Sequence, residues 1–192
     1  MGEITVVCSL TLDGVMQAPG RPDEDQRDDF QYGGWGAPYS QDAMGRVLRQ
    51  RAGATGATGG MLLGRRTYAD FADFWPKQED NPYTDSLNKQ QKYVVSSILK
   101  DPDWVNSHVI TLDDIAELKA DQDLIILGSG ELIRSIPTLI DQYILLTHPL
   151  VLGTGHHLFG DHHQPLTLDH SEPTTTGVVI NTYRPTARPK NG

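Results

Sequence analysis

The chain of 192 residues has a formal net charge of -9 and a pI near 5.1, and its length fits one domain with a core of its own. The acidic balance argues against nucleic acid or an anionic membrane as the main partner, because both require a concentrated basic face. The single cysteine, Cys8, excludes an internal disulfide framework and cysteine-based zinc sites, and it fits a cytoplasmic location. Neither a signal peptide nor an apolar run of about 18 residues is present, so we expect no membrane span.

A first strand is predicted at residues 4–10, and Thr11-Leu12-Asp13-Gly14 follows as its exit. The polar loop after this turn is long and ends at Gly33-Gly34-Trp35-Gly36. Long loops inside a compact domain are usually functional or mobile. Ser40 is then a suitable N-cap for a helix, because apolar residues repeat at helical spacing over residues 43–48.

A second strand is predicted at residues 61–63, and Gly64 leads from it into a helix. The apolar residues of residues 68–75 fall at i, i+3, i+4 and i+7, and Pro76 is expected to end this helix. Two further short strands are predicted at residues 93–97 and 108–111, and a helix capped by Asp113 or Asp114 follows them.

Residues 123–132 repeat the order of strand, glycine turn and helix. The four apolar residues 124–127 are typical of a strand that is buried on both faces. Gly128 and Gly130 then form a turn into a helix that is expected to end near Pro137. Such a turn presents free backbone N–H groups and the positive end of a helix dipole to a phosphate; the alternative is an ordinary turn that needed glycine.

The last quarter of the chain is rich in predicted strands, at residues 142–152, 166–168 and 176–183, of which the last two form an antiparallel pair. Pro149 indicates a bend or an edge in the first of them. Residues 1–184 are therefore predicted to form a single α/β domain of three layers, with a mostly parallel central sheet and antiparallel C-terminal edge strands. Residues 185–192 are predicted to be a disordered tail.

The two glycine turns follow two predicted parallel strands, and the carboxyl ends of such strands are where open α/β sheets bind ligands. Arg65 and Arg66 add a cationic pair that suits the 2′-phosphate of NADP, although they also fit a solvated helix start. Ser96 and Ser97 place hydroxyl groups at the same edge, and alone they indicate no more than a turn.

Other candidate residues have two interpretations each. Asp13 and Gly14 form either a turn, which the chemistry favours, or a polar group in the cleft. Trp35 and Tyr39 either wall an aromatic pocket or anchor the long loop. Asp42 lies in a first helical turn, where the dipole favours an acid, so helix stabilisation is its main expected role.

Four loop histidines invite a metal assignment because imidazole is a common metal ligand: His156, His157, His162 and His163. No carboxylate or thiol partner stands at a recognised zinc spacing, so we expect no metal site and interpret them as facing solvent or substrate. The chain also lacks the G-x-S-x-G pattern of nucleophilic hydrolases.

An ordered set of motifs over residues 3–184 resembles the dihydrofolate reductase-like superfamily, and within it the family named for the reductase domain of the bacterial riboflavin-biosynthesis protein RibD. The motifs are Thr11-Leu12-Asp13-Gly14, Gly33-Gly34-Trp35, Leu62-Leu63-Gly64-Arg65-Arg66-Thr67-Tyr68, Tyr93-Val94-Val95-Ser96, Leu127-Gly128-Ser129-Gly130-Glu131-Leu132 and Pro149-Leu150-Val151-Leu152-Gly153.

The resemblance implies a dihydrofolate reductase-like fold, NADPH as hydride donor, a small heterocycle as acceptor and a homodimer. It implies cofactor phosphates held by Gly64, Arg65, Arg66 and Thr67, by Ser96 and Ser97 near the 2′-phosphate, and by Gly128, Ser129, Gly130, Glu131 and Leu132 from the opposite side. It also implies a substrate end formed by Asp13, Gly14, Trp35, Tyr39 and Asp42, with Asp13 as the catalytic residue.

The sequence departs from the riboflavin enzymes in two respects. Neither the histidine/glutamate motif nor the cysteine pair of the deaminase half occurs in this sequence, and Val15 follows the first motif where riboflavin reductases usually carry a basic or polar residue. The implied substrate is 5-amino-6-(5-phosphoribosylamino)uracil; the alternatives are dihydrofolate, or a protein that binds NADPH without turnover.

Overall fold

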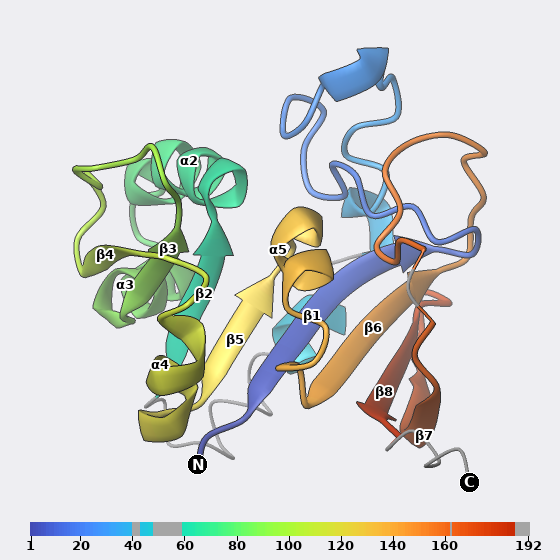
Figure 1. Cartoon of the computed structure of the whole chain (residues 1–192). Helices are drawn as coiled ribbons and strands as arrows, with labels where there is room; N and C mark the ends of the chain where they lie inside the picture. The colour runs from blue at the N-terminus through green and yellow to red at the C-terminus, as the bar shows by residue number, and fades with distance from the viewer. Residues whose placement is uncertain (40–42, 48–58, 162, 187–192) are drawn as a thin grey trace, which may run out of the picture.

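The computed structural model describes residues 1–39, 43–47, 59–161 and 163–186. Its strands are β1 (Ile4–Thr11), β2 (Gly60–Gly64), β3 (Lys92–Val95), β4 (Ser107–Ile110), β5 (Leu124–Leu127), β6 (Gln142–His148), β7 (Leu166–Pro173) and β8 (Val179–Pro185). They form one sheet in the order β4-β3-β2-β5-β1-β6-β8-β7 (Figure 1). The pairs among β1 to β6 are parallel, whereas β8 runs antiparallel to β6 and β7 antiparallel to β8. The predicted mixed sheet is confirmed.

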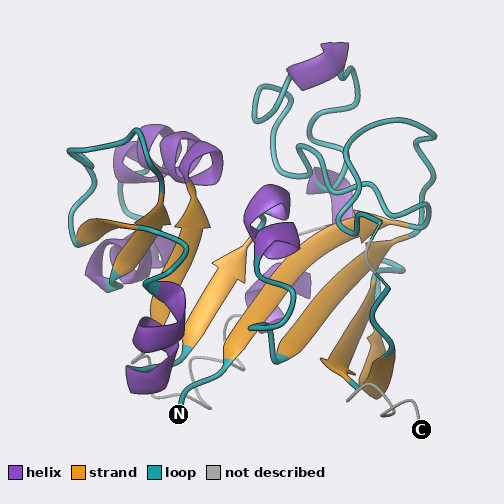
Figure 2. Cartoon of the chain, viewed as in Figure 1, coloured by secondary structure: helices purple, strands orange, loops and turns teal. Residues whose placement is uncertain are grey.

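Helices cover both faces of the sheet (Figure 2). They are α2 (Arg65–Phe74), α3 (Pro82–Lys89), α4 (Ile115–Asp121) and α5 (Gly130–Ser135), with the 3₁₀ turns η1 (Arg27–Asp29) and η2 (Trp75–Lys77). Because side chains alternate along a strand, Val6 and Cys8 of β1 pack with α4 and α5, while Val7 packs with α2, α3 and helical residues 43–47. The two apolar clusters make the three predicted layers, and no described helix is long and apolar enough to cross a membrane.

Helix α3 is the main element that the sequence did not predict. Pro82 occupies its first turn, and the Asn81 side chain accepts a hydrogen bond from the backbone N–H of Tyr83 at 3.0 Å. Asparagine before proline is also a common turn signal, which hides such a start.

The C-terminal strands are longer than predicted. Strand β7 extends from Leu166 to Pro173, and most of it is exposed at the edge of the sheet, so it lacks the apolar alternation that reveals a buried strand. Strand β8 reaches Pro185, which pairs with Leu166 and therefore does not belong to a disordered tail. Residues 187–192 lie outside the described residues, as do Ser40 and Asp42.

The lengths of the central strands open a groove at their carboxyl ends. Strand β2 pairs with β5 only at Gly60↔Leu124 and Met61↔Ile125, although β2 continues to Gly64. Strand β5 ends at Leu127 opposite Val7, whereas β1 continues to Thr11. The turns that follow β2 and β5 therefore face each other beside an uncovered length of β1.

Candidate functional site

A cleft of about 1780 Å³ includes the carboxyl ends of β1, β2, β3 and β5 and extends to Gly59, Gln90 and Asp123 at the amino ends of β2, β3 and β5. Its lining includes Cys8 and Ser9 of β1, residues 64–67 after β2, residues 95–98 after β3 and residues 127–132 after β5. Pockets for a single small molecule usually measure roughly 300–1,000 Å³, so the cleft as a whole is larger than such a pocket.

The turn after β2 forms one flank of the cleft. Helix α2 begins at Arg65, and its N-cap residue Gly64 supplies no side-chain hydrogen bond to the first turn. The amides of this turn therefore remain available to a ligand anion. Arg65 and Arg66 are both exposed at this helix start, and Arg65 makes no ion pair with the described residues.

The turn after β5 forms the opposite flank. Gly128 and Ser129 have φ values of 68° and 61°, so two consecutive residues adopt the left-handed conformation. For serine this conformation is unfavourable, and such residues cluster at functional sites. Here it directs the Ser129 hydroxyl across the groove, where Oγ accepts a hydrogen bond from Gly64 N–H at 3.0 Å and donates one to Thr67 Oγ1 at 2.9 Å. Helix α5 has only six residues, so its dipole is a weaker argument for phosphate than the sequence suggested.

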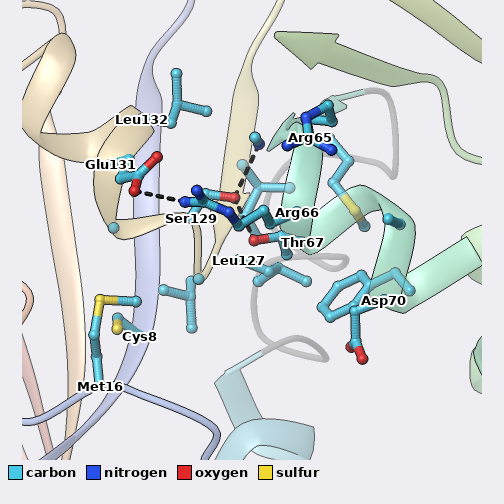
Figure 3. A pocket seen from close by; sticks show the side chains of 18 of the residues that line it. Cys8, Met16, Arg65, Arg66, Thr67, Asp70, Leu127, Ser129, Glu131 and Leu132 are labelled. Carbon is cyan, nitrogen blue, oxygen red and sulfur yellow. Dashed lines mark hydrogen bonds and ion pairs between the residues drawn. The ribbon is translucent and has the colours of Figure 1, made fainter. Parts of the chain in front are cut away.

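Charged side chains also join the two flanks. Figure 3 shows Arg66 and Glu131 meeting over the groove, with 2.6 Å between Nη1 and Oε1. This arginine is the main reason that the pKa of the Glu131 carboxyl lies below its ordinary value. The structure thus brings together in one cleft all the residues that the sequence assigned to the cofactor: Gly64, Arg65, Arg66, Thr67, Ser96, Ser97, Gly128, Ser129, Gly130, Glu131 and Leu132.

Ser96 and Ser97 lie farther along the same cleft, after β3. Ser96 Oγ accepts hydrogen bonds from the backbone N–H groups of Ile98 and Leu99, at 3.2 and 3.0 Å, so it also stabilises a turn. Ile98 and Leu112 line the cleft beside it and are 67% and 46% exposed. Two exposed apolar side chains next to polar ones suit the flat face of a base.

Asp13, which the sequence suggested as the catalytic residue, does not line the cleft. Its carboxylate accepts hydrogen bonds from Thr11 Oγ1 at 2.5 Å, Gly153 N–H at 2.7 Å and Leu152 N–H at 3.3 Å. These donors, the Thr11 hydroxyl first, lower the pKa of Asp13 to about 2, so the group stays ionised. Asp13 joins its turn to the loop after β6, and Gly14 supplies the positive φ of 82° that this turn requires.

Trp35 and Tyr39 anchor the long loop and do not line the cleft. The indole Nε1–H of Trp35 donates to the backbone oxygen of Gln17 at 2.7 Å. Both rings pack edge-on against the buried His148, at centroid distances of 5.1 and 5.7 Å. Burial lowers the pKa of His148, so its ring packs as neutral imidazole. The interpretation of these aromatic residues as loop anchors is therefore supported, and Asp42 lies outside the described residues.

The long loop itself contributes the residues that the sequence did not single out. Arg21 pairs with Asp70 of α2 and stacks on the Phe74 ring at 4.2 Å from its centroid, which carries the loop across the cleft. Within it, Glu24 Oε2 accepts hydrogen bonds from Gly20 N–H at 2.7 Å and Arg21 N–H at 3.2 Å. Burial raises the pKa of Glu24 above its ordinary value. The length of the loop was the only feature of the sequence that suggested a functional role for these residues.

The histidine loop meets the cleft through His156, whose Nε2 lies 3.0 Å from Asp28 Oδ2. Over residues 1–39, 43–47, 59–161 and 163–186, no three histidine, cysteine or acidic side chains are grouped as a metal site requires. His162 lies outside these ranges.

The sheet order, its two helical layers and the cleft at its carboxyl edge define the dihydrofolate reductase-like fold. Residues 3–180 match the family model of the RibD C-terminal domain, and the chain belongs to this family. Among curated proteins it is 29% identical to the uncharacterized protein YyaP of Bacillus subtilis (strain 168), over 64% of this chain and 72% of that protein.

Solved structures share the fold at low identity. A protein of Shewanella sp. PV-4 provisionally assigned to riboflavin biosynthesis has a TM-score of 0.68 and 23% identity, covering 96% of this chain and 99% of that one. A pyrimidine reductase-like protein of Corynebacterium diphtheriae has a TM-score of 0.63 and 13% identity, with 97% and 92% covered. Dihydrofolate reductase of Enterococcus faecalis, complexed with NADP(H) and RAB-propyl, has a TM-score of 0.57 and 12% identity, with 97% and 98% covered.

Proposed function

We propose that this protein is an NADPH-dependent reductase of a small heterocycle. The observation that carries the proposal is the convergence of the turns after β2 and β5 on one cleft, with Arg65 exposed at its rim. Membership of the RibD C-terminal domain family and the NADP(H) complex of the similar dihydrofolate reductase support it.

The residues present fit a phosphorylated dinucleotide. The turns at residues 64–67 and 128–132 would hold the phosphates, and Arg65 with Ser96 and Ser97 would hold the 2′-phosphate. Cys8, Ser9 and Met16 line the cleft beside β1 and would enclose the nicotinamide end. Bound NADPH would supply a hydride from its nicotinamide C4 to a C=N or C=O carbon of the acceptor.

A proton must then reach the nitrogen or oxygen of the reduced bond. Glu24 is suited to deliver it, because its carboxyl lies in the cleft and burial favours its protonated form. The rigid attachment of the loop through Arg21 and Asp70 would keep Glu24 in place. Asp13, which is ionised and does not line the cleft, is not suited to this role.

The first candidate acceptor is 5-amino-6-(5-phosphoribosylamino)uracil, which the family suggests. One observation favours dihydrofolate as the second. Arg21, the arginine that acts on Glu24, is already paired with Asp70, so it is not free to hold a ribose phosphate. Assays of NADPH consumption with the two acceptors separate them, and a third outcome, binding without consumption, would indicate a non-catalytic protein.

Cofactor choice is tested by Arg65→Gln, with binding followed by tryptophan fluorescence. We expect NADPH to quench the wild type and the variant to bind NADPH about tenfold more weakly, with NADH affected little, because only NADPH has the 2′-phosphate. Equal losses of affinity for both cofactors would show that Arg65 does not bind the 2′-phosphate. If millimolar NADPH does not quench the tryptophan fluorescence of the wild type, the proposal is refuted.

We further propose a cytoplasmic homodimer joined through the late strands, where β7 forms an edge of the sheet. Light scattering that finds only a 21.2 kDa particle would exclude the dimer.

A further inference from the structure

Three arginine side chains surround the Glu131 carboxylate at the mouth of the cleft. Nη1 of Arg66 lies 2.6 Å from Oε1 of Glu131, and Nη1 of Arg27 lies 3.6 Å from the same oxygen. Arg134 is near enough to contribute to the lowered pKa of Glu131. These arginines come from α2, η1 and α5, so the fold gathers them from separate segments at one point.

The cluster gathers three guanidinium groups although the whole chain has a net charge of -9. Arg27 also binds Asp25, with 2.6 Å between Nη2 and Oδ2, and the charge of Asp28 acts on it as well, so three guanidinium groups face three carboxylates. The Arg66 and Glu131 side chains are 54% and 66% exposed, and ion pairs this exposed contribute little net free energy. A ligand with more negative charge than one carboxylate can therefore displace Glu131.

The position of this carboxylate matters because it closes the groove between the two turns. Beside it, Ser129 Oγ already accepts the Gly64 N–H and donates to Thr67, at 3.0 and 2.9 Å. Hydrogen bonds in both directions thus join the two flanks (Figure 3). A phosphate entering the groove meets Arg66 with Glu131 already bound to it.

We propose that Arg27 and Arg66 form the anion site for the diphosphate of the dinucleotide, and that Glu131 occupies this site until the cofactor binds. The inference rests on the proposed function and changes two roles. Glu131, assigned to cofactor binding from the sequence, becomes an intramolecular competitor. Arg27, which the sequence did not single out, becomes a binding residue that links the long loop to the diphosphate.

Glu131→Gln tests the competition, because it keeps the shape of the side chain and removes its charge. NADPH and inorganic pyrophosphate are titrated by calorimetry against wild type and variant at low salt. We expect both to bind about 1.5- to 5-fold more tightly to the variant, the range that an exposed ion pair accounts for. The gain should shrink as salt screens the charges.

The matched control is Glu117→Gln, an exposed glutamate in the first turn of α4 that lies outside the cleft on the same face of the sheet. Its affinity for both ligands should equal that of the wild type. If Glu131→Gln binds NADPH no more tightly than this control, Glu131 is not a competitor and the inference is wrong.

Arg27→Gln tests the other half of the site and should weaken both ligands about fivefold or more. Arg184→Gln is its control, because Arg184 also pairs with two acids, Glu3 and Asp169, outside the cleft. Unchanged affinity in Arg27→Gln overturns the anion site. If the two substitutions change the affinity for pyrophosphate as expected but NADPH binds to neither the wild type nor the variants, the anion site stands and the proposed function fails. If NADPH binds and neither substitution changes its affinity, the proposed function stands and the anion site fails.

Discussion

Two acidic residues show how surroundings decide which carboxyl group is suited to donate a proton. Asp13 is half-buried outside the cleft, and its hydrogen bonds, chiefly from Thr11, lower its pKa to about 2. Glu24 lies in the cleft, and burial raises its pKa. A proton donor needs a raised pKa and a place in the cleft, and of these two acids Glu24 alone combines both properties.

Glu24→Gln should lower kcat by about 100-fold or more with NADPH and the accepted heterocycle, because proton transfer by a positioned acid contributes that much. In the wild type, kcat should fall as the pH rises through the elevated pKa, and this limb should vanish in the variant. NADPH affinity should remain unchanged. A pH profile that keeps the same limb in Glu24→Gln would assign the proton to another group.

The same substitution has a consequence for stability. A carboxyl group whose folded pKa is raised contributes stability below its unfolded pKa, and loses it as the pH rises through the folded value. Glu24→Gln should therefore melt no lower than the wild type at pH 8, which separates lost catalysis from lost folding.

At the scale of elements, patterns that depend on neighbouring residues were predictable from the sequence. The strand, glycine and helix order at β2 with α2 and at β5 with α5 follows from local periodicity, and parallel strands bring their carboxyl ends to one edge. The meeting of Arg65 and Ser129 in one cleft could thus be predicted. Local patterns could not predict whether Asp13 and Trp35 lie in the cleft, because their positions depend on how a turn and the long loop fold against the rest of the chain.

The long loop is the element whose placement local patterns could not reveal. Arg21 and Asp70 are separated by 49 positions, and their contact carries the loop over the cleft. Arg21→Gln should release this segment, so backbone amides of residues 18–26 should exchange hydrogen faster, while those of β1 should not change. Arg184→Gln serves as the control. Equal exchange in the loop of Arg21→Gln and wild type would mean that other contacts, such as those of Gln17, hold it alone.

At the scale of the whole molecule, the sheet is least connected where the cofactor would lie. Strands β2 and β5 share two register positions, whereas β1 and β5 share four. A dinucleotide held by the turns after β2 and β5 would join the two parts of the sheet, so its binding should stabilise the entire domain. NADPH at about 100 times its Kd should add roughly 2.7 kcal/mol, or about 5–10 °C in Tm for a chain of this length.

Calorimetric melting with and without NADPH measures this effect, and hydrogen exchange shows where it acts. Amides of β2 and β5 should gain the most protection from exchange. If these strands separate, the contacts between the bound phosphates and one of the two turns must break. Arg65→Gln should reduce the Tm gain for NADPH and leave the smaller gain for NADH unchanged. A rise in Tm with protection confined to the long loop would place the cofactor against that loop and not across the junction between β2 and β5.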